Sequence, residues 1–313
     1  MREFEVINRF FDRPTANRSW VRKGIGDDGA VLTPSPGFDS VVVTDTSVSG
    51  VHFTDEQAPE SVGYRSLAVN LSDIAAMGAE PRWVTLNLTL EQSDPAWLEE
   101  FARGFFRLAD SSNLTLVGGD TTKGPLCITA TVGGEVQSGQ GLYRSGAQVG
   151  DLIVVSGHLG GAAAALASGR TSAEDALGHV FRYPVPRLDL GKALCGIANS
   201  AIDISDGLLT DLQHILRDSG GLGASIEADK IPLFDEACSA FGSERAIELA
   251  LTGGDDYELC FTVSPSQLKT VLDLERACLV RLTPIGIVRE SAGLEISGFE
   301  TGAAPMTGYE HTW

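Results

Sequence analysis

The stretch AIDISDG, residues 201–207, decides how the second half of this chain folds. Its first residues alternate like a short buried strand, and an apolar run with helical spacing follows at residues 208–216. Asp203, Ser205 and Asp206 are therefore predicted where a strand passes into a helix, and open α/β sheets bind ligands at such strand ends. Asp206 is also predicted to cap the helix.

Three further stretches combine carboxylates with apolar segments: VTDT at residues 43–46, NLSD at 70–73 and VGGDTT at 117–122. The first is predicted at the carboxyl end of a buried strand at 41–43, and the third just beyond a strand at 114–117. The second lies on the face of a predicted helix. Hard oxygen ligands at this density indicate magnesium, and magnesium indicates a ligand that carries phosphate.

Elsewhere the pattern of apolar residues also predicts strands and helices. Residues 84–90 alternate without a fault, which predicts a strand with one apolar and one polar face. Ser93 or Asp94, followed by Pro95, predicts the start of the next helix.

The length of 313 residues predicts about two domains, and 43% hydrophobic residues are enough to give each a core. The boundary is expected within residues 137–150, which are rich in Gly, Ser and Gln. We therefore expect an α/β (α+β) protein with one domain at residues 1–138 and a second, of sheet and helices, at residues 139–313.

The net charge of −19 restricts the possible partners. Nucleic-acid binding needs a basic face, so we expect no nucleic-acid partner. The same charge repels ATP: two unit charges about 4 Å apart cost roughly 4 kcal/mol at an effective dielectric near 20. A polyphosphate therefore needs metal ions between itself and the protein.

The cysteines and the amino terminus predict a cytoplasmic protein. Five cysteines are an odd number without a CxxC pair, which is typical of small core residues in a reducing compartment. The start of the chain has no apolar signal-peptide region, and no apolar run reaches 18 residues. We expect no membrane partner.

Residues 24–29, GIGDDG, formally match the GxGxxG pattern. We reject a dinucleotide site, because that motif needs an apolar strand before it and a helix after it, and two aspartates would face a pyrophosphate. A glycine loop that carries metal ligands fits better. The chain also lacks a P-loop and the HRD and DFG motifs of protein kinases, so phosphates would be held by metal bridges and backbone N–H groups.

Seven aspartates occupy turn or helix positions where they could bind two to four magnesium ions at one or two carboxylates each. They are Asp27, Asp28, Asp45, Asp73, Asp120, Asp203 and Asp206. Each alone could be a helix cap or a turn residue; a purely structural role for all seven is a much weaker explanation.

Together these motifs resemble the thiamine-monophosphate kinase family, in the superfamily of aminoimidazole ribonucleotide synthetase and selenophosphate synthetase. The matching stretches are GIGDDGA (24–30), VTDTSVSGVHF (43–53), AVNLSDIAAMGAEP (68–81), VGGDTTKGPL (117–126), RSGAQVGD (144–151), SAIDISDGLLTDL (200–212) and LTGGDDYELCFTV (251–263). The resemblance implies transfer of the γ-phosphate of ATP to thiamine monophosphate, with several Mg²⁺ ions. It also implies a homodimer in which the amino-terminal domains pair through their sheets.

The resemblance also assigns roles to individual residues. The implied magnesium ligands are Asp28, Thr44, Asp45, Asp73, Asp120, Asp203 and Asp206, of which Asp45, Asp120 and Asp206 are the expected catalytic carboxylates. The implied ATP contacts are Gly119, Asp120, Arg144 and Ser205, and the implied contacts to the thiamine substrate are His52, Asp255 and Tyr309. Two residues depart from the family pattern: Asp255 replaces a glutamate, and Val43 replaces a frequent serine.

The residues and the resemblance agree on direct in-line transfer without a phosphoenzyme. Clustered magnesium neutralises charge on the transferred group, and an acceptor that is already anionic needs no strong general base. Two alternatives remain open from the sequence. One is an ATP-dependent synthetase of the same superfamily acting on an amide or selenide, and the other is a non-catalytic calcium- or nucleotide-binding protein.

Overall fold

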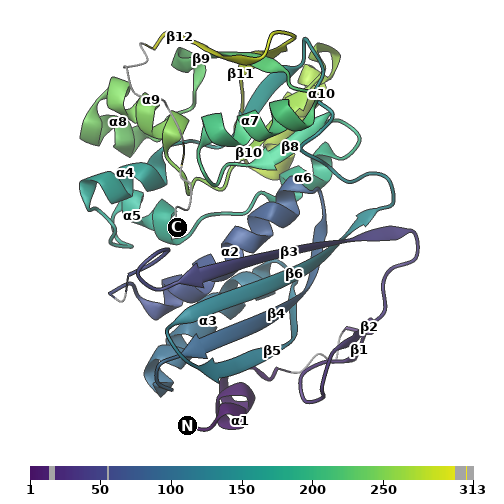
Figure 1. The fold of residues 1–313 in the computed structure, drawn as a ribbon, viewed down its shortest axis with the longest axis vertical. Helices are drawn as coiled ribbons and strands as arrows, with labels where there is room; N and C mark the ends of the chain where they lie inside the picture. The colour runs from purple at the N-terminus through teal and green to yellow at the C-terminus, as the bar shows by residue number, and fades with distance from the viewer. Residues whose placement is uncertain (14–17, 55, 300–307, 309–313) are drawn as a thin grey trace. The chain divides into compact units, whose positions relative to one another are not determined.

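The computed structural model describes residues 1–13, 18–54, 56–299 and 308. The chain divides into two compact units (Figure 1). Unit 1 comprises Met1–Ile74 and Ala79–Gly139, and unit 2 comprises Ala75–Gly78 and Gln140–Trp313.

Unit 1 is built on a sheet of four strands, as far as the described residues go. Its elements are α1 (Glu3–Val6), the π-helix η1 (Ile7–Phe11), β1 (Val21–Lys23), β2 (Val31–Leu32), β3 (Phe38–Val48), α2 (Pro59–Ala76, whose last two residues belong to unit 2), β4 (Glu80–Leu90), α3 (Pro95–Ser111), β5 (Thr115–Lys123) and β6 (Cys127–Gln137). The strand order is β3-β6-β4-β5, with β4 and β5 parallel and the other pairs antiparallel. Helices α2 and α3 cover one face of this sheet (Figure 1).

Strand β4 and helix α3 confirm the predictions for this part of the chain. In β4 the leucines at 86, 88 and 90 are buried, whereas the polar residues between them are not. Asp94 is the N-cap of α3, and its side chain accepts a hydrogen bond from the Ala96 N–H at 2.9 Å. Pro95 occupies the first turn, as expected.

Strands β3 and β5 run further than predicted, so two expectations were wrong. Thr44 and Asp45 lie within β3 and not beyond its end, and Gly119 and Asp120 lie within β5. Strand β3 pairs with β6 along its whole length, and β5 continues beside β4, so backbone hydrogen bonds extend both strands through polar sequence. The strand at 41–43 is also not fully buried, because Val42 is 59% exposed.

Unit 2 is built on a sheet of six strands within the described ranges. Its elements are β7 (Leu152–Ser156), α4 (Gly161–Ser168), α5 (Ala176–Arg182), α6 (Leu188–Leu194), β8 (Ser200–Asp203), α7 (Leu208–Asp218), β9 (Gly223–Glu227), η2 (Ala228–Lys230), α8 (Asp235–Phe241), α9 (Ser243–Thr252), β10 (Leu259–Val263), η3 (Pro265–Gln267), α10 (Leu268–Cys278), β11 (Leu282–Arg289) and β12 (Gly293–Ser297). The order is β12-β9-β11-β7-β10-β8, with β9 and β12 parallel and the other pairs antiparallel.

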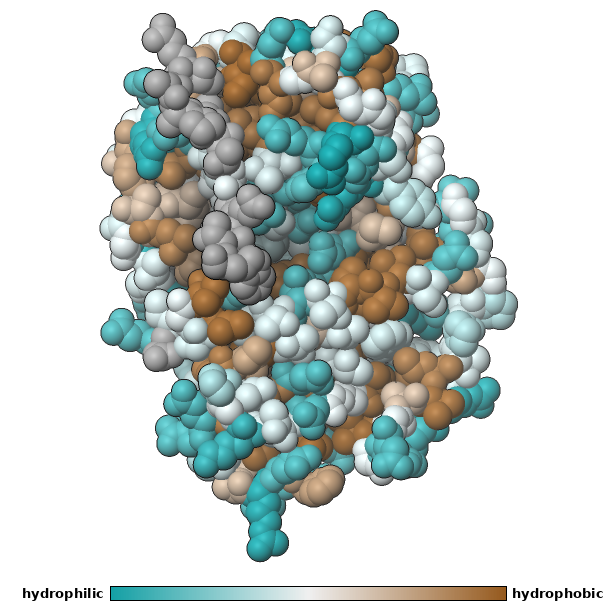
Figure 2. All heavy atoms as spheres, in the orientation of Figure 1, coloured by the Kyte–Doolittle hydropathy of each residue, from teal (hydrophilic) through white to brown (hydrophobic). Residues whose placement is uncertain are grey.

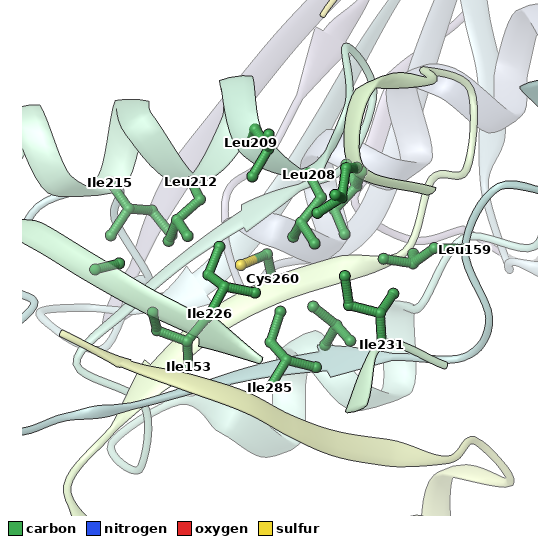
Figure 3. Close-up of a cluster of buried hydrophobic side chains, with 14 of the residues drawn as sticks. Ile153, Leu159, Leu208, Leu209, Leu212, Ile215, Ile226, Ile231, Cys260 and Ile285 are labelled. Atoms are coloured by element: carbon green, nitrogen blue, oxygen red, sulfur yellow. The ribbon is translucent and has the colours of Figure 1, made fainter. Parts of the chain in front are cut away.

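Helices pack on both faces of the second sheet, because its strands are apolar on both sides. Ile153 and Val155 of β7 belong to the core under α7, whereas Val154 between them belongs to the core shared with α6 and α10. Leu212 and Ile215 show how α7 is anchored in the first of these cores (Figure 3). The predicted helix after residue 207 is therefore confirmed.

The prediction that Asp206 caps this helix was wrong. The N-cap of α7 is Gly207, which has a φ of +125° and makes no side-chain cap hydrogen bond. The backbone N–H groups of the turn just before the helix donate to a carboxylate from within the helix, which is described below with the site.

All five cysteines, each of them in the described part of the chain, are free. None of the helices in the described ranges combines the length and apolar character that a membrane span needs.

Candidate active site

The glycine loop, residues 24–30, and strand β5 line one cavity of unit 1, with a volume of about 640 Å³. Asp27 and Asp28 lie on the loop, and Gly119 and Asp120 lie on the strand, so the structure brings these four predicted residues to one cavity. Apolar side chains of α1 and η1 form another part of its lining. The volume falls in the range of small-molecule sites, and the lining suits a ligand with both an apolar and an anionic part.

Within the glycine loop the two aspartates differ in their contacts. The Asp27 carboxylate accepts the Asp28 backbone N–H at 3.0 Å and lies 3.4 Å from Lys23 Nζ. The Asp28 hydrogen bond and then Lys23 hold the pKa of Asp27 below its ordinary value. Asp27 therefore shapes the loop, and both aspartates are exposed and line the cavity.

Asp45 and Asp73 form an acidic pair between β3 and α2. The buried Asn70 amide joins these elements: its Oδ1 accepts the Asp45 N–H at 3.1 Å, and its Nδ2 donates to the Ser66 carbonyl at 3.2 Å. Burial raises the pKa of Asp45, while hydrogen bonding with Asp73 and the nearby His52 lower it. A partly buried pair of carboxylates is a costly arrangement that a cation would stabilise.

His52 and Thr44 are placed differently around this acidic pair. His52 Nδ1 accepts the Val48 N–H at 3.1 Å, which holds the imidazole in the turn after β3. Thr44 precedes Asp45 in the same strand, so its side chain projects from the opposite face of the sheet. There its hydroxyl lies 2.6 Å from that of Thr131. The structure does not bring the Thr44 and Asp45 side chains together.

The acidic turn of unit 2, residues 205–207, follows β8 and precedes α7. All three of its backbone N–H groups donate to Oδ2 of Asp211, at 3.0, 3.0 and 3.1 Å in chain order. Burial, and then the charges of Asp203 and Asp206, raise the pKa of Asp211 to about 7, although the backbone hydrogen bonds act in the opposite direction. Asp211 was missed from the sequence; its signal is a carboxylate one helical turn after a glycine at a helix start.

The Gly-Asp loop, residues 253–258, lies beside the acidic turn. The Asp255 N–H donates to the Ser205 carbonyl at 2.8 Å, and the Tyr257 hydroxyl donates to the Asp255 carboxylate at 3.0 Å. Asp255 and Tyr257 have φ of +72° and +51°, a left-handed conformation that non-glycine residues rarely adopt. At the end of the loop, Arg187 Nε donates to the buried Glu258 carboxylate at 2.7 Å. The loop is therefore fixed at several points.

The backbone of Arg144 lies near the carboxyl end of α7, because its carbonyl accepts a hydrogen bond from Ser219 Oγ at 3.5 Å. The backbone N–H groups of Gly146 and Ala147 donate to Ser219 Oγ, which places this segment at the carboxyl end of α7, whereas Ser205 precedes the opposite end. Burial, and then the charges of Arg217 and Arg144, lower the pKa of His214 in α7, while Asp218 and Asp206 act in the opposite direction. The Arg144 guanidinium and the Asp206 carboxylate therefore both lie near this histidine. Tyr309, the third predicted substrate contact, lies outside the described residues.

The predicted metal ligands fall into sets within each unit. Unit 1 holds Asp28 with Asp120 and Asp45 with Asp73, and unit 2 holds Asp203 with Asp206. Across the described residues, no group of three or more His, Cys, Asp or Glu side chains is arranged to hold a metal ion. The oxygen-only pairs nevertheless fit Mg²⁺, which binds one or two carboxylates together with substrate phosphates and water.

The two units also match two halves of one known class of proteins. Residues 26–136 match the model for the AIR synthase related protein, N-terminal domain, and residues 148–298 match the model for the C-terminal domain. Within this class the chain belongs to the thiamine-monophosphate kinase family.

Several relatives support this membership. The thiamine-monophosphate kinase of Escherichia coli K12 is 44% identical over 99% of this chain and 98% of its own length. The crystal structure of the Stenotrophomonas maltophilia K279a thiamine-monophosphate kinase has a TM-score of 0.88 and 42% identity, covering 96% of this chain and 98% of that one. The structure of AaThiL complexed with AMPPCP and TMP has a TM-score of 0.78 and 31% identity, covering 93% and 92%.

Proposed function

We propose that this protein transfers the γ-phosphate of ATP to thiamine monophosphate, giving thiamine diphosphate and ADP. The observation that carries the proposal is the near full-length identity of 44% to the Escherichia coli thiamine-monophosphate kinase. The relative AaThiL binds AMPPCP, a non-hydrolysable analogue of ATP, together with TMP. The cavity lined by Asp28, Gly119 and Asp120 has the mixed apolar and acidic character that a nucleotide polyphosphate with cations requires.

We propose that magnesium ions are held by the carboxylates of Asp28, Asp45, Asp73, Asp120, Asp203 and Asp206, with Thr44 as a further oxygen donor. When bound, these ions would neutralise charge on the two anionic substrates, which otherwise repel each other and the protein of net charge −19. Because Thr44 and Asp45 project from opposite sheet faces, Thr44 would contribute its backbone carbonyl to an ion on the Asp45 side.

The protein itself positions the groups that would contact the cations and substrates. Asn70 fixes the backbone of Asp45 against α2, and the Asp255 N–H fixes the carbonyl of Ser205. Gly119 and the glycine loop allow backbone to approach a phosphate closely. We propose that Arg144 and Ser205 contact the nucleotide, and that His52, Asp255 and Tyr309 contact the thiamine substrate. Direct transfer follows, because the acceptor oxygen is already anionic and no side chain has to carry the phosphoryl group.

The full chain is to be incubated with ATP, thiamine monophosphate and Mg²⁺, and thiamine diphosphate measured by chromatography. We expect product to form with Mg²⁺, to disappear on chelation and to return when Mg²⁺ is added back. ATP consumption without thiamine diphosphate would instead favour the synthetase alternative, and nucleotide binding without turnover the non-catalytic one. With a chiral γ-thiophosphate, direct transfer predicts inversion at phosphorus; net retention would contradict it.

We propose that two copies pair through the sheets of unit 1. The sheet face opposite α2 and α3 carries the exposed Val42 and rows of small hydroxyl side chains, in which Thr46 lies 2.8 Å from Thr129. Figure 2 views this face and shows pale residues of intermediate hydropathy and brown hydrophobic residues over much of it. A surface with few charges and some exposed apolar area is typical of protein interfaces.

Sedimentation of the full chain is expected to give twice the monomer mass of 33.0 kDa. Val42→Lys places a charge on the proposed interface and should shift the protein towards monomer. Val185→Lys changes an equally exposed valine of unit 2 and should leave the mass unchanged. A monomeric wild type at micromolar concentration would reject the proposal.

A further inference from the structure

Asp211 lies in the first turn of α7 and is 2% exposed. Its Oδ2 receives the three consecutive N–H groups of the acidic turn. We propose that Asp211 is a positioning residue for phosphoryl transfer: it holds the acidic turn in place and thereby sets how Asp206 faces a cation bound beside Asp203. The inference rests on the cation site of the proposed function.

The contact geometry supports a role in shaping this turn. The first N–H groups of a helix have no partner within the helix, and a side chain before the helix usually accepts them. Here the carboxylate of Asp211, inside the helix, instead accepts the N–H groups of the N-cap, Gly207, and of the two residues before it, and Gly207 makes no side-chain cap bond. Asp206 is therefore not used as the helix cap, although it stands next to the cap position.

The acidic turn is held from two sides. Asp211 accepts its N–H groups, while the Asp255 N–H donates to the Ser205 carbonyl on the other side at 2.8 Å. A Cβ at Gly207 would lie 2.8 Å from the Thr252 carbonyl oxygen, so the turn is also tightly packed against the neighbouring loop. Without Asp211, three N–H groups lose their acceptor and one of the two supports is gone.

The effect on the turn is separable from the effect on the fold. Leu208, Leu209 and Leu212 anchor the start of α7 in the apolar core, and their packing does not depend on the Asp211 carboxylate (Figure 3). Loss of a residue that orients metal ligands typically weakens metal binding by about 10- to 100-fold. We therefore expect a folded protein whose cation affinity is reduced.

Asp211→Ala and Asp211→Asn form a matched pair, because both remove the same charge and only asparagine keeps a carbonyl oxygen that can accept the N–H groups. Binding of Mn²⁺ to the full chain in the presence of AMPPCP is to be measured by electron paramagnetic resonance. The Mg²⁺ dependence of thiamine diphosphate formation is to be measured alongside. We expect Asp211→Asn to bind Mn²⁺ a few-fold more weakly than wild type, and Asp211→Ala at least about tenfold more weakly than Asp211→Asn.

Asp218→Asn is the control, because it removes an exposed carboxylate from the other end of the same helix and should bind Mn²⁺ like wild type. Equal affinities in Asp211→Ala and Asp211→Asn would overturn the positioning role while leaving the cation site intact. Absence of Mn²⁺ binding by the wild type would overturn the cation site itself. If Asp211→Ala does not fold, Asp211→Ser takes its place in the comparison, since a hydroxyl lacks the reach of the carboxylate.

Discussion

Asparagine in place of Asp45 is expected to lower kcat for thiamine diphosphate formation by about a thousandfold, with little change in thermal stability. The carboxylate is replaced by a neutral group of the same shape, so a cation held by Asp45 and Asp73 loses one of its charged ligands. The Asp45 N–H still donates to Asn70, because this bond uses the backbone. The local fold of β3 should therefore be kept.

In the absence of cations, the free energy of unfolding of Asp45→Asn should equal or exceed that of the wild type. Burial raises the pKa of Asp45, which means that the folded state disfavours its charged form, and asparagine removes that cost. Asp39→Asn is the control on the same strand. The Asp39 carboxylate lies at the far end of β3, where it accepts a hydrogen bond from the Ser138 hydroxyl at 2.8 Å. The activity of this variant should stay within about twofold of wild type. Wild-type turnover by Asp45→Asn would remove Asp45 from the mechanism.

Alanine in place of Gly119 is expected to destabilise unit 1 by about 3 kcal/mol or more and to abolish nucleotide binding. Gly119 has a φ of +147°, and an added Cβ would lie 1.9 Å from the Leu86 carbonyl oxygen on the paired strand. Strand β5 would have to separate from β4 at the wall of the cavity. Thermal unfolding and calorimetric titration with AMPPCP measure the two effects.

The adjacent glycine provides the matched control for this substitution. A Cβ on Gly118 would meet only the Thr85 methyl group, at 3.9 Å, and Gly118 does not have a positive φ. The free energy of unfolding of Gly118→Ala should therefore lie within about 0.5 kcal/mol of the wild-type value. If both variants were equally stable, the close approach of β5 to β4 at Gly119 would not be a real constraint.

The sequence predicted those elements that have one strong local signal. Residues 84–90 alternate because one face of β4 is buried, and Asp94-Pro95 carries the chemistry of a helix start. The ends of β3 and β5 were not predictable in this way. They continue through Asp45 and Asp120 because neighbouring strands supply hydrogen bonds, and those partners are distant in the chain.

The sequence predicted which acidic residues belong to the candidate site, but not how the fold arranges them relative to one another. The sequence singled out Asp45 and Asp73, but only the fold shows that a buried amide, Asn70, joins their two elements. Asp206 was expected to cap α7 because it precedes the helix. Asp211 instead accepts the N–H groups of the turn before the helix, that of Asp206 among them, from inside the helix, which a rule based on position cannot detect.

The left-handed backbone at Asp255 and Tyr257 has a consequence for how tightly a ligand can be held. Such a conformation costs about 1–3 kcal/mol at a non-glycine residue and persists only where the surroundings enforce it. This conformational cost is part of the free energy of folding, so it does not have to be met again when a small molecule binds. A loop that is already rigid loses little conformational entropy when a ligand binds to it, so more of the contact energy remains as binding affinity.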